Sequence, residues 1–326
     1  MTVTFTYNQL NQLELQATLY SASNPKGLIL YFHGGGLIYG SRDDLPSSYI
    51  NQFTQAGYSL LSLDYPLIPE VKIDTLVQSL EEGIQQLELI PELKNENFSR
   101  LIYFGRSAGA FLALLLSQSK KLKIPEQIIS FYGYYSLTEH LLSEPSSHYK
   151  NYQAVPFMTV YELIKKEPIL NSLIEERFPI YLSYRQSGTW VKELLGRKNK
   201  AEDFSLTKES LKNLPPTFIA ASHSDQDVPV SISQEMSKLI PNTQTFFTKN
   251  LPHDFDANLQ LDVGKRCYQE VIYWLDSFNF YPTIRVPAFP SKASTASVKE
   301  QIIAVLPNLA NSIQAAIFGP ILPSEK

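Results

Sequence analysis

Continuous apolar runs, separated by segments of helical periodicity, constrain the fold of this chain more than any other feature. Strands that are buried on both faces have no alternating polar positions, and parallel sheets are built from such strands. The runs are Leu28–Phe32, Tyr58–Leu63, Leu101–Phe104, Gln127–Tyr132, Thr217–Ala221 and Thr243–Phe247. The helical segments are Leu45–Ala56, Ile73–Leu89, Ala108–Ser117, Val230–Leu239 and Val263–Phe278. This alternation predicts an α/β fold with a mostly parallel, doubly wound sheet.

The start of the chain shows a different period. Apolar residues alternate with mostly polar ones over Val3–Tyr7 and again over Leu13–Leu19, and the turn-prone stretch Asn8–Asn11 separates the two. Alternation of this kind is typical of strands with one exposed face. We therefore expect an antiparallel hairpin before the parallel strands.

The regular alternation stops after Tyr135 and resumes only at the strand that begins at Thr217, a gap far longer than an ordinary connection. The gap contains helical patterns at Val160–Lys166 and Trp190–Leu195 and many aromatic residues. It predicts a helical cap inserted over the C-terminal edge of the sheet. The expected division is an α/β core of residues 1–135 and 214–280, a cap of residues 136–213 and a C-terminal extension of residues 281–326.

The C-terminal extension holds two short apolar patterns, residues 298–305 and 309–318, with Pro307 between them. Their length and the polar residues inside them exclude a membrane span. We expect the extension to dock onto the body of the protein or to form a homo-oligomer, and the sequence leaves its role open.

Charge and cysteine content exclude several classes of partner. The chain of 326 residues has 28 basic and 32 acidic residues, a net charge of -4 and no dense Lys/Arg cluster, so we expect no nucleic-acid partner. The first residues have no basic and apolar signal pattern, which favours a cytoplasmic location. The single cysteine, Cys267, excludes an internal disulfide and is expected to be a buried small hydrophobe.

The motif Gly-Arg-Ser-Ala-Gly at 105–109 follows a predicted strand and opens a predicted helix. In that context G-x-S-x-G forms a tight turn that exposes the serine at the sheet edge. Glycines flank the serine because a Cβ at either position would collide with neighbouring backbone. Ser107 is therefore the candidate nucleophile, whereas we expect the side chain of Arg106 to point away from the site.

A second motif, His-Gly-Gly-Gly at 33–36, directly follows the strand Leu28–Phe32. Consecutive glycines let backbone N–H groups approach a ligand without obstruction by side chains, as an oxyanion hole requires. His33 itself is expected to brace this loop.

Together with the sequence Asp-Tyr-Pro-Leu-Ile-Pro-Glu at 64–70, these motifs resemble the hormone-sensitive-lipase-like carboxylesterase branch of the α/β-hydrolase superfamily. The resemblance covers most of the chain from Leu28 to Phe278 and implies the α/β-hydrolase fold. This chain has Pro66 where the branch usually has Arg, so the acyl-peptidase-like and small-esterase branches stay open. The resemblance also implies that the backbone N–H groups of Gly35, Gly36 and Ala108 form the oxyanion hole.

A serine hydroxyl needs a base to take its proton and an acid to orient that base. In the α/β-hydrolase fold these residues follow the serine in the order acid, then histidine. Of the five histidines, only His253 lies in a loop between the last strand and the last helix, so His253 is the predicted base.

The acid is expected in the turn after the strand Thr217–Ala221. Members of the family commonly show an acid, two further residues and then Val-Pro at this turn, which selects Asp225 here. Asp227 is the competitor, because a slip of one residue in the predicted strand end would exchange the two. Asp254 and Asp256 are expected to hold the histidine loop or to cap the next helix.

These residues predict a serine hydrolase that cleaves small-molecule esters of short to medium acyl chains through an acyl-enzyme, without a metal or an organic cofactor. Two alternatives remain. One is an acyl-peptidase-like amide hydrolase, and the other is a ligand-binding protein on a silenced hydrolase scaffold.

Overall fold

The computed structural model describes residues 1–278, and its strands form one eight-stranded sheet. The spatial order is β1-β2-β4-β3-β5-β6-β7-β8. The strands are β1 (Thr2–Leu10), β2 (Leu13–Tyr20), β3 (Gly27–Phe32), β4 (Tyr58–Leu63), β5 (Leu101–Arg106), β6 (Gln127–Phe131), β7 (Thr217–Ser222) and β8 (Thr243–Thr248). Strand β2 pairs antiparallel with both β1 and β4, whereas all other pairs are parallel. The predicted hairpin and the mostly parallel sheet are confirmed.

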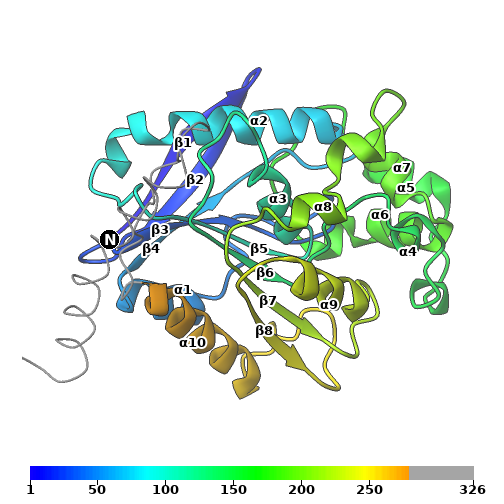
Figure 1. Ribbon diagram of the computed structural model, residues 1–326. Coiled ribbons are helices and arrows are strands. Elements are labelled where there is room, and N and C mark those ends of the chain that lie inside the picture. Colours follow the sequence, from blue (N-terminus) through cyan, green and yellow to red (C-terminus); the bar gives the residue numbers. More distant parts are fainter. Residues whose placement is uncertain (279–326) are drawn as a thin grey trace, which may run out of the picture. The chain divides into compact units, whose positions relative to one another are not determined.

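Helices cover both faces of this sheet, as expected for a doubly wound fold (Figure 1). One face packs against α2 (Ile73–Gln86), α3 (Ala108–Leu116) and α9 (Val230–Leu239), and the other packs against α1 (Ser47–Gln55) and α10 (Asp262–Ser277). Two 3-10 turns, η1 (Leu87–Leu89) and η2 (Pro91–Leu93), follow α2. Cys267 is fully buried on the inner side of α10, which confirms its expected place in the core.

Five of the six continuous runs became central strands, which are buried because they lie between two helical layers. The sixth, Thr243–Phe247, became the edge strand β8, so the expectation that it is buried on both faces was wrong: an edge strand has a neighbour on one side only. Every residue of β3, β4, β5 and β6 is buried. The helix that follows β5 is buried almost all round, since α3 has the sequence Ala-Gly-Ala-Phe-Leu-Ala-Leu-Leu-Leu and lies between the sheet and α2. Buried residues therefore lie on both sides of the turn that joins the end of β5 to the start of α3.

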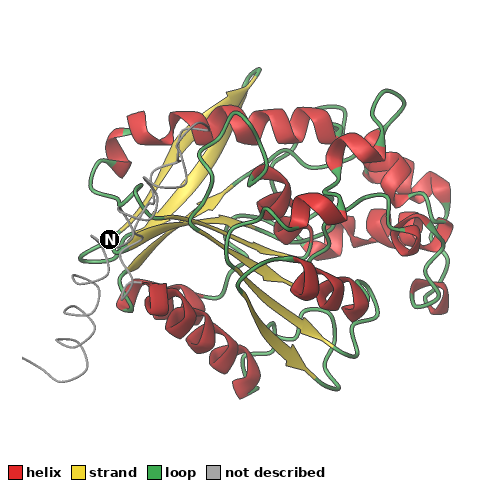
Figure 2. Ribbon diagram, viewed as in Figure 1, coloured by secondary structure: helices red, strands yellow, loops and turns green. Residues whose placement is uncertain are grey.

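The β6–β7 segment, residues 132–216, contains mainly helices that lie together at one end of the sheet (Figure 2). They are α4 (His140–Ser143), η3 (Tyr149–Asn151), α5 (Phe157–Leu163), α6 (Ile174–Ser187), α7 (Trp190–Leu195), η4 (Ala201–Phe204) and α8 (Lys208–Leu211). The division into a core and a cap stays a prediction. The extension of residues 281–326 lies outside the described residues.

Helix α6 was not expected from the sequence. It contains Pro179, which lacks a backbone N–H and usually interrupts a helix, and its apolar residues do not follow a helical stripe. Tertiary packing compensates, because Ile180, Tyr181 and Tyr184 are all buried. Local propensity is a weak determinant where packing of this extent is available.

A buried ion pair ties α6 to the loop after β4. The guanidinium of Arg177 donates to both carboxylate oxygens of Glu70, each at 2.7 Å, and also to the carbonyl oxygens of Ile38 and Ile68. The side chain of Arg177 is 3% exposed and that of Glu70 is fully buried. Every charge is therefore paired, which is the condition for keeping an ion pair inside a protein.

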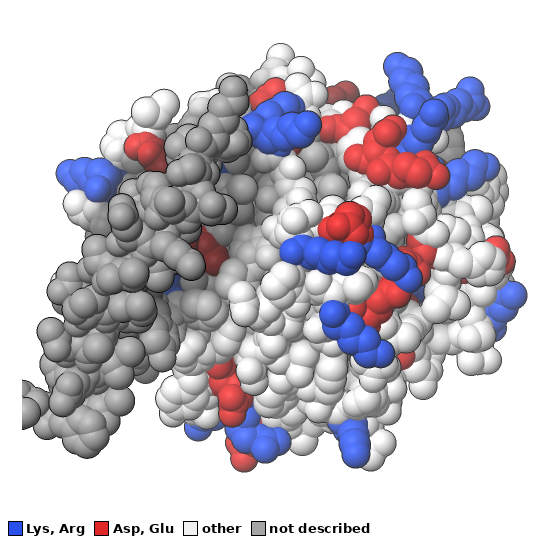
Figure 3. All heavy atoms as spheres, in the orientation of Figure 1, with Lys and Arg blue, Asp and Glu red and all other residues white. Residues whose placement is uncertain are grey.

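Charged residues on the surface are mixed in sign. On the face shown in Figure 3, acidic and basic side chains are interspersed over a largely uncharged surface. In residues 1–278 no helix has both the length and the apolar character that crossing a bilayer demands.

We expect Arg177→Ala to destabilise the fold by about 3–5 kcal/mol, because Glu70 would remain buried without its partner. Denaturant unfolding measures this effect. Replacing both residues, as Arg177→Met with Glu70→Leu, should restore part of the loss. A single Arg177→Ala variant as stable as the parent would contradict this account.

Candidate active site

Ser107 lies at the sharp turn between β5 and α3. Its backbone has φ 54° and ψ -120°, a conformation that residues with a side chain rarely adopt and that the surrounding structure must hold in place. The N–H of Ser107 donates to the carbonyl oxygen of Phe131 at 2.9 Å, which fixes the turn against β6.

The two glycines of the motif allow this turn. A Cβ on Gly105 would lie 2.1 Å from the backbone of Gly109, and a Cβ on Gly109 would lie 2.0 Å from the carbonyl oxygen of Phe32. Both contacts are with backbone atoms, so no side-chain movement could relieve them. The motif is therefore a geometric requirement of the turn, as the sequence predicts.

The structure brings the three predicted triad residues together. Nε2 of His253 is 2.8 Å from Oγ of Ser107, and Nδ1 of His253 is 2.6 Å from Oδ2 of Asp225. Asp225 also accepts backbone N–H groups from Asp227 and Val228, each at 2.9 Å. This arrangement gives a hydroxyl, an imidazole and a carboxylate in the order that general-base activation of a serine requires.

Asp227, the competing acid, is directed elsewhere. Both of its carboxylate oxygens accept a hydrogen bond from the hydroxyl of Tyr181, at 2.9 and 2.8 Å, and Arg185 is 3.3 Å from Oδ1. Asp225 is thus the carboxylate in contact with His253, whereas Asp227 anchors α6 of the β6–β7 segment.

The glycine loop at 33–36 lies against the serine turn. A Cβ on Gly34 would approach the Cβ of Ser107 to 3.6 Å. Gly35 and Gly36 have φ values of 98° and 62°, which suit glycine because they lie in the left-handed region. Among the described residues, the backbone N–H groups of Gly35, Gly36 and Ala108 donate no hydrogen bond. These donors are therefore available to an oxyanion.

His33 braces the glycine loop. Its Nδ1 donates to the carbonyl oxygen of Gly34 at 2.8 Å, and its ring stacks on Tyr65 with ring centres 4.1 Å apart. The hydroxyl of Tyr65 donates to the carbonyl oxygen of His33 at 2.8 Å. Burial lowers the pKa of His33, so this imidazole stays neutral in the loop.

Two aromatic side chains from the β6–β7 segment, Tyr181 and Trp190, cover the glycine loop and are called the aromatic roof below. A Cβ on Gly36 would lie 2.5 Å from the ring of Tyr181, and the indole N–H of Trp190 donates to the carbonyl oxygen of Gly36 at 3.1 Å. The rings of Tyr181 and Trp190 also pack edge to face, with centres 6.1 Å apart. This roof leaves little space directly above the loop.

Arg106, the residue before Ser107, points into the interior. It lies 3.3 Å from the carboxylate of Asp256 and donates to the hydroxyl of Tyr132 at 2.7 Å. Tyr132 in turn donates to Asp256 at 2.8 Å, and its ring packs against His253 with ring centres 4.7 Å apart. Asp256 thus holds the histidine loop against the serine turn, as one of its expected roles requires.

A cavity of about 530 Å³ opens beside His253. Its walls come from α6 and the preceding loops of the β6–β7 segment, from the Asp225 turn and from the histidine loop. Four aromatic residues and two aspartates are among the residues that line it: Tyr39, Tyr149, Tyr152, Phe178, Asp227 and Asp254. Its position next to the imidazole makes it the candidate substrate cavity.

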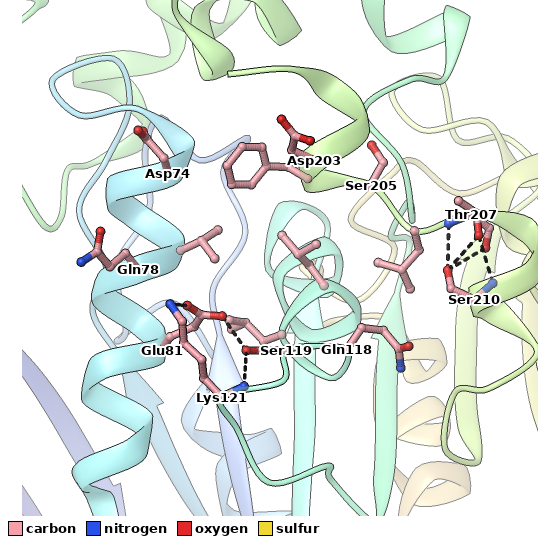
Figure 4. A pocket seen from close by; sticks show the side chains of 15 residues that line it. Asp74, Gln78, Glu81, Gln118, Ser119, Lys121, Asp203, Ser205, Thr207 and Ser210 are labelled. Carbon is pink, nitrogen blue, oxygen red and sulfur yellow. Dashed lines mark hydrogen bonds and ion pairs between the residues drawn. The ribbon is translucent and has the colours of Figure 1, made fainter. Parts of the chain in front are cut away.

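A second cavity, of about 590 Å³, lies between α2, the end of α3 and η4 (Figure 4). None of the three triad residues lines it. One of the carboxylates that line it is already paired, because Glu81 accepts from Lys121 at 2.7 Å and from Ser119 at 2.5 Å. Size alone therefore does not identify the functional cavity.

The sequence did not point to Tyr132, Tyr181 or Trp190 as parts of the site. Tyr132 directly follows β6 and has φ 41°, whereas Tyr181 and Trp190 belong to helices α6 and α7. No local motif marks them, since each reaches the site only through tertiary packing. The cluster of aromatic residues before Thr217 was the available signal.

Comparison with known families gives one match that covers most of the described chain. A family model with the description BD-FAE matches residues 18–240. Among curated proteins, non-reducing polyketide synthase adrD of Penicillium rubens is 28% identical over an alignment of 193 positions, which covers 51% of this chain and 7% of that protein. The chain thus corresponds to a small part of the length of these relatives.

Solved structures match over nearly the whole described chain. A protein of unknown function from Staphylococcus aureus subsp. aureus Mu50 has a TM-score of 0.77 at 28% identity, covering 84% of this chain and 98% of that chain. An α/β hydrolase superfamily protein from Enterococcus faecalis has a TM-score of 0.72 at 29% identity, covering 84% and 99%. An esterase from Pyrobaculum calidifontis shares the fold, with a TM-score of 0.60 at 16% identity over 86% and 87%. Together these matches support a hydrolase.

The environment of His253 leads to a prediction about its protonation. Burial by itself lowers the pKa of His253, but the carboxylate of Asp225, followed by those of Asp227 and Asp254, outweighs burial and raises the pKa above the usual 6.5. We therefore expect the imidazole to titrate above pH 6.5 when followed by NMR. Asp254→Asn should lower the midpoint, because it removes one of the negative charges.

The control for this titration is Glu92→Gln, which removes an exposed carboxylate in η2 that does not line the cavity. It should leave the midpoint of His253 in place. A parent midpoint below 6.5 would contradict the predicted direction.

Proposed function

Since this chain belongs to the BD-FAE family and to the α/β-hydrolase superfamily, we propose that it is a serine carboxylesterase. The superfamily agrees with the one that the two glycine motifs predicted, and the hormone-sensitive-lipase-like branch fits the esterases among the similar structures. The observation that carries the proposal is the continuous contact from Ser107 through His253 to Asp225, with distances of 2.8 and 2.6 Å.

In the proposed reaction, Oγ of Ser107 attacks the ester carbonyl carbon while Nε2 of His253 takes the hydroxyl proton. Asp225 holds the Nδ1–H of the imidazole and stabilises the positive charge that develops on it. The backbone N–H groups of Gly35, Gly36 and Ala108 donate hydrogen bonds to the carbonyl oxygen and stabilise the negative charge that develops on it. A single donor of this kind is typically worth about 10²–10³ in kcat.

The tetrahedral intermediate then collapses. His253 returns its proton to the leaving oxygen, the bond between the carbonyl carbon and that oxygen breaks, and the alcohol departs from the acyl-enzyme on Ser107. In the second half, His253 takes a proton from a water molecule as its oxygen attacks the acyl carbon. His253 then returns that proton to Oγ of Ser107 as the bond from Oγ to the acyl carbon breaks, and the carboxylic acid is released. The positions of the three residues support both halves without a further group.

The aromatic roof over the glycine loop supports a preference for substrates with short acyl groups. The carbonyl oxygen of the ester must reach the N–H groups of this loop, and Tyr181 and Trp190 pack directly on Gly36. A long acyl chain would have to displace these buried rings, which are fixed by Asp227 and by the carbonyl of Gly36. We therefore propose short- to medium-chain acyl esters as substrates.

Ser107→Ala should reduce the turnover of p-nitrophenyl acetate by about a million-fold, the scale seen when a triad nucleophile is removed. Hydrolysis followed by release of p-nitrophenol measures it. Ser117→Ala is the matched control, because this serine is buried at the end of α3, away from His253. A parent enzyme that cleaves amides but no ester would favour the amide-hydrolase alternative instead.

Acyl preference provides a separate test. We expect kcat/KM for p-nitrophenyl esters to be highest with acetate or butyrate and to fall towards palmitate, because of the aromatic roof. Trp190→Ala should shift the preference towards longer chains by removing part of this roof. Activity that rises steadily to palmitate in the parent would refute the proposed acyl specificity.

A further inference from the structure

We propose that the cavity beside His253 binds the alcohol part of the ester and selects alcohols that carry a positive charge. This inference rests on the proposed esterase function and adds the chemical class of the leaving group. Three observations support it: the position of the cavity, its aromatic walls and the sign of the charges that line it.

Position assigns the cavity to the alcohol. His253 must return its proton to the leaving oxygen, so that oxygen has to lie within hydrogen-bonding reach of Nε2. The same imidazole and the neighbouring residues Leu251, Pro252 and Asp254 form one wall of the cavity. The roof of Tyr181 and Trp190 lies over the glycine loop, where the carbonyl oxygen binds. The alcohol therefore extends from His253 into the cavity.

Aromatic rings form another wall. Tyr39 packs edge to face on Phe178 with ring centres 6.2 Å apart, and Tyr149 lies 6.3 Å from Phe178 and 5.9 Å from Tyr152. The faces of aromatic rings carry negative electrostatic potential. Such walls attract cations, and quaternary ammonium groups are bound in this way.

The charged groups that line the cavity are acidic. Asp227 and Asp254 line it, and the described lining residues include no lysine or arginine. Burial, followed by the negative charges of Asp227 and Asp254, raises the pKa of Tyr39, which agrees with both carboxylates lying near this ring.

One buried cation, Arg185, contacts two of the residues that line the cavity and contributes to the local charge. Arg185 pairs with Asp227 at 3.3 Å and lies over the ring of Tyr149, with 5.9 Å to the ring centre. It offsets the charge of Asp227, whereas Asp254 is exposed and has no ion pair among the described residues. Asp225 is held by the Nδ1–H of His253, whose imidazole is uncharged before it takes the serine proton. The balance around the cavity therefore stays negative.

The test compares esters that differ only in charge. Acetylcholine and its uncharged carbon isostere, 3,3-dimethylbutyl acetate, have the same acyl group and nearly the same shape. At the same pH for both esters, we expect kcat/KM to be about tenfold higher for acetylcholine, since aromatic walls and an unpaired carboxylate both favour the cation. The anionic ester 4-acetoxybutanoate should be the poorest substrate.

Two variants test the residues. Asp254→Asn should reduce the preference for acetylcholine over the isostere several-fold and weaken its dependence on salt, because the preference is electrostatic. Phe178→Leu should also reduce it, through loss of an aromatic wall. Glu92→Gln, which removes a carboxylate remote from the cavity, should leave the preference unchanged.

The outcomes separate this inference from the esterase function. If 3,3-dimethylbutyl acetate is cleaved as fast as acetylcholine or faster, selection of a cation is wrong and the esterase function stands. If no ester is cleaved, the proposed function fails. Isothermal titration calorimetry with the Ser107→Ala variant then tests the cavity without catalysis. Choline should bind more tightly than its uncharged isostere 3,3-dimethylbutan-1-ol, and equal or weaker binding of choline would overturn the inference.

Discussion

The buried interaction between Arg106 and Asp256 joins two parts of the chain that have to meet at the active site. Arg106 precedes Ser107 at the end of β5, and Asp256 follows His253 in the loop before α10. Asp256 is fully buried and also accepts hydrogen bonds from Tyr132 and Tyr268, each at 2.8 Å. Because a buried charge without a partner is strongly destabilising, this network holds the serine turn and the histidine loop in one arrangement.

The β6–β7 segment acts on the site from the opposite side. Its helix α6 is tied to the loop after β4 by Arg177 and to the Asp225 turn through Tyr181 and Asp227. These contacts place Tyr181 on the glycine loop and Phe178 in the wall of the cavity. One helix thus limits the space over the glycine loop and shapes the space beside His253. The proposed preferences for acyl group and alcohol follow from the same packing.

Local sequence was informative wherever backbone geometry leaves few options. The turn at Ser107 needs glycine at positions 105 and 109, and the loop at 33–36 needs glycine where φ is positive, so both motifs can be read directly. The central strands were equally clear, because a run buried on both faces has no polar alternation. Helix α6 could not be predicted, since Pro179 and an irregular apolar pattern hide a helix that tertiary packing stabilises. The catalytic roles of the residues brought together here stay predictions until the variants are measured.

The sequence by itself determined the α/β fold, the serine turn, the glycine loop and a short choice of histidine and acid. Only the tertiary structure decided which aspartate contacts His253, since Asp225 and Asp227 differ by two positions and point to different partners. It also decided which aromatic rings cover Gly36 and which surround the cavity. The physical reason is that turn geometry depends on the residue and its neighbours, whereas a cavity depends on side chains that come together only after the chain has folded.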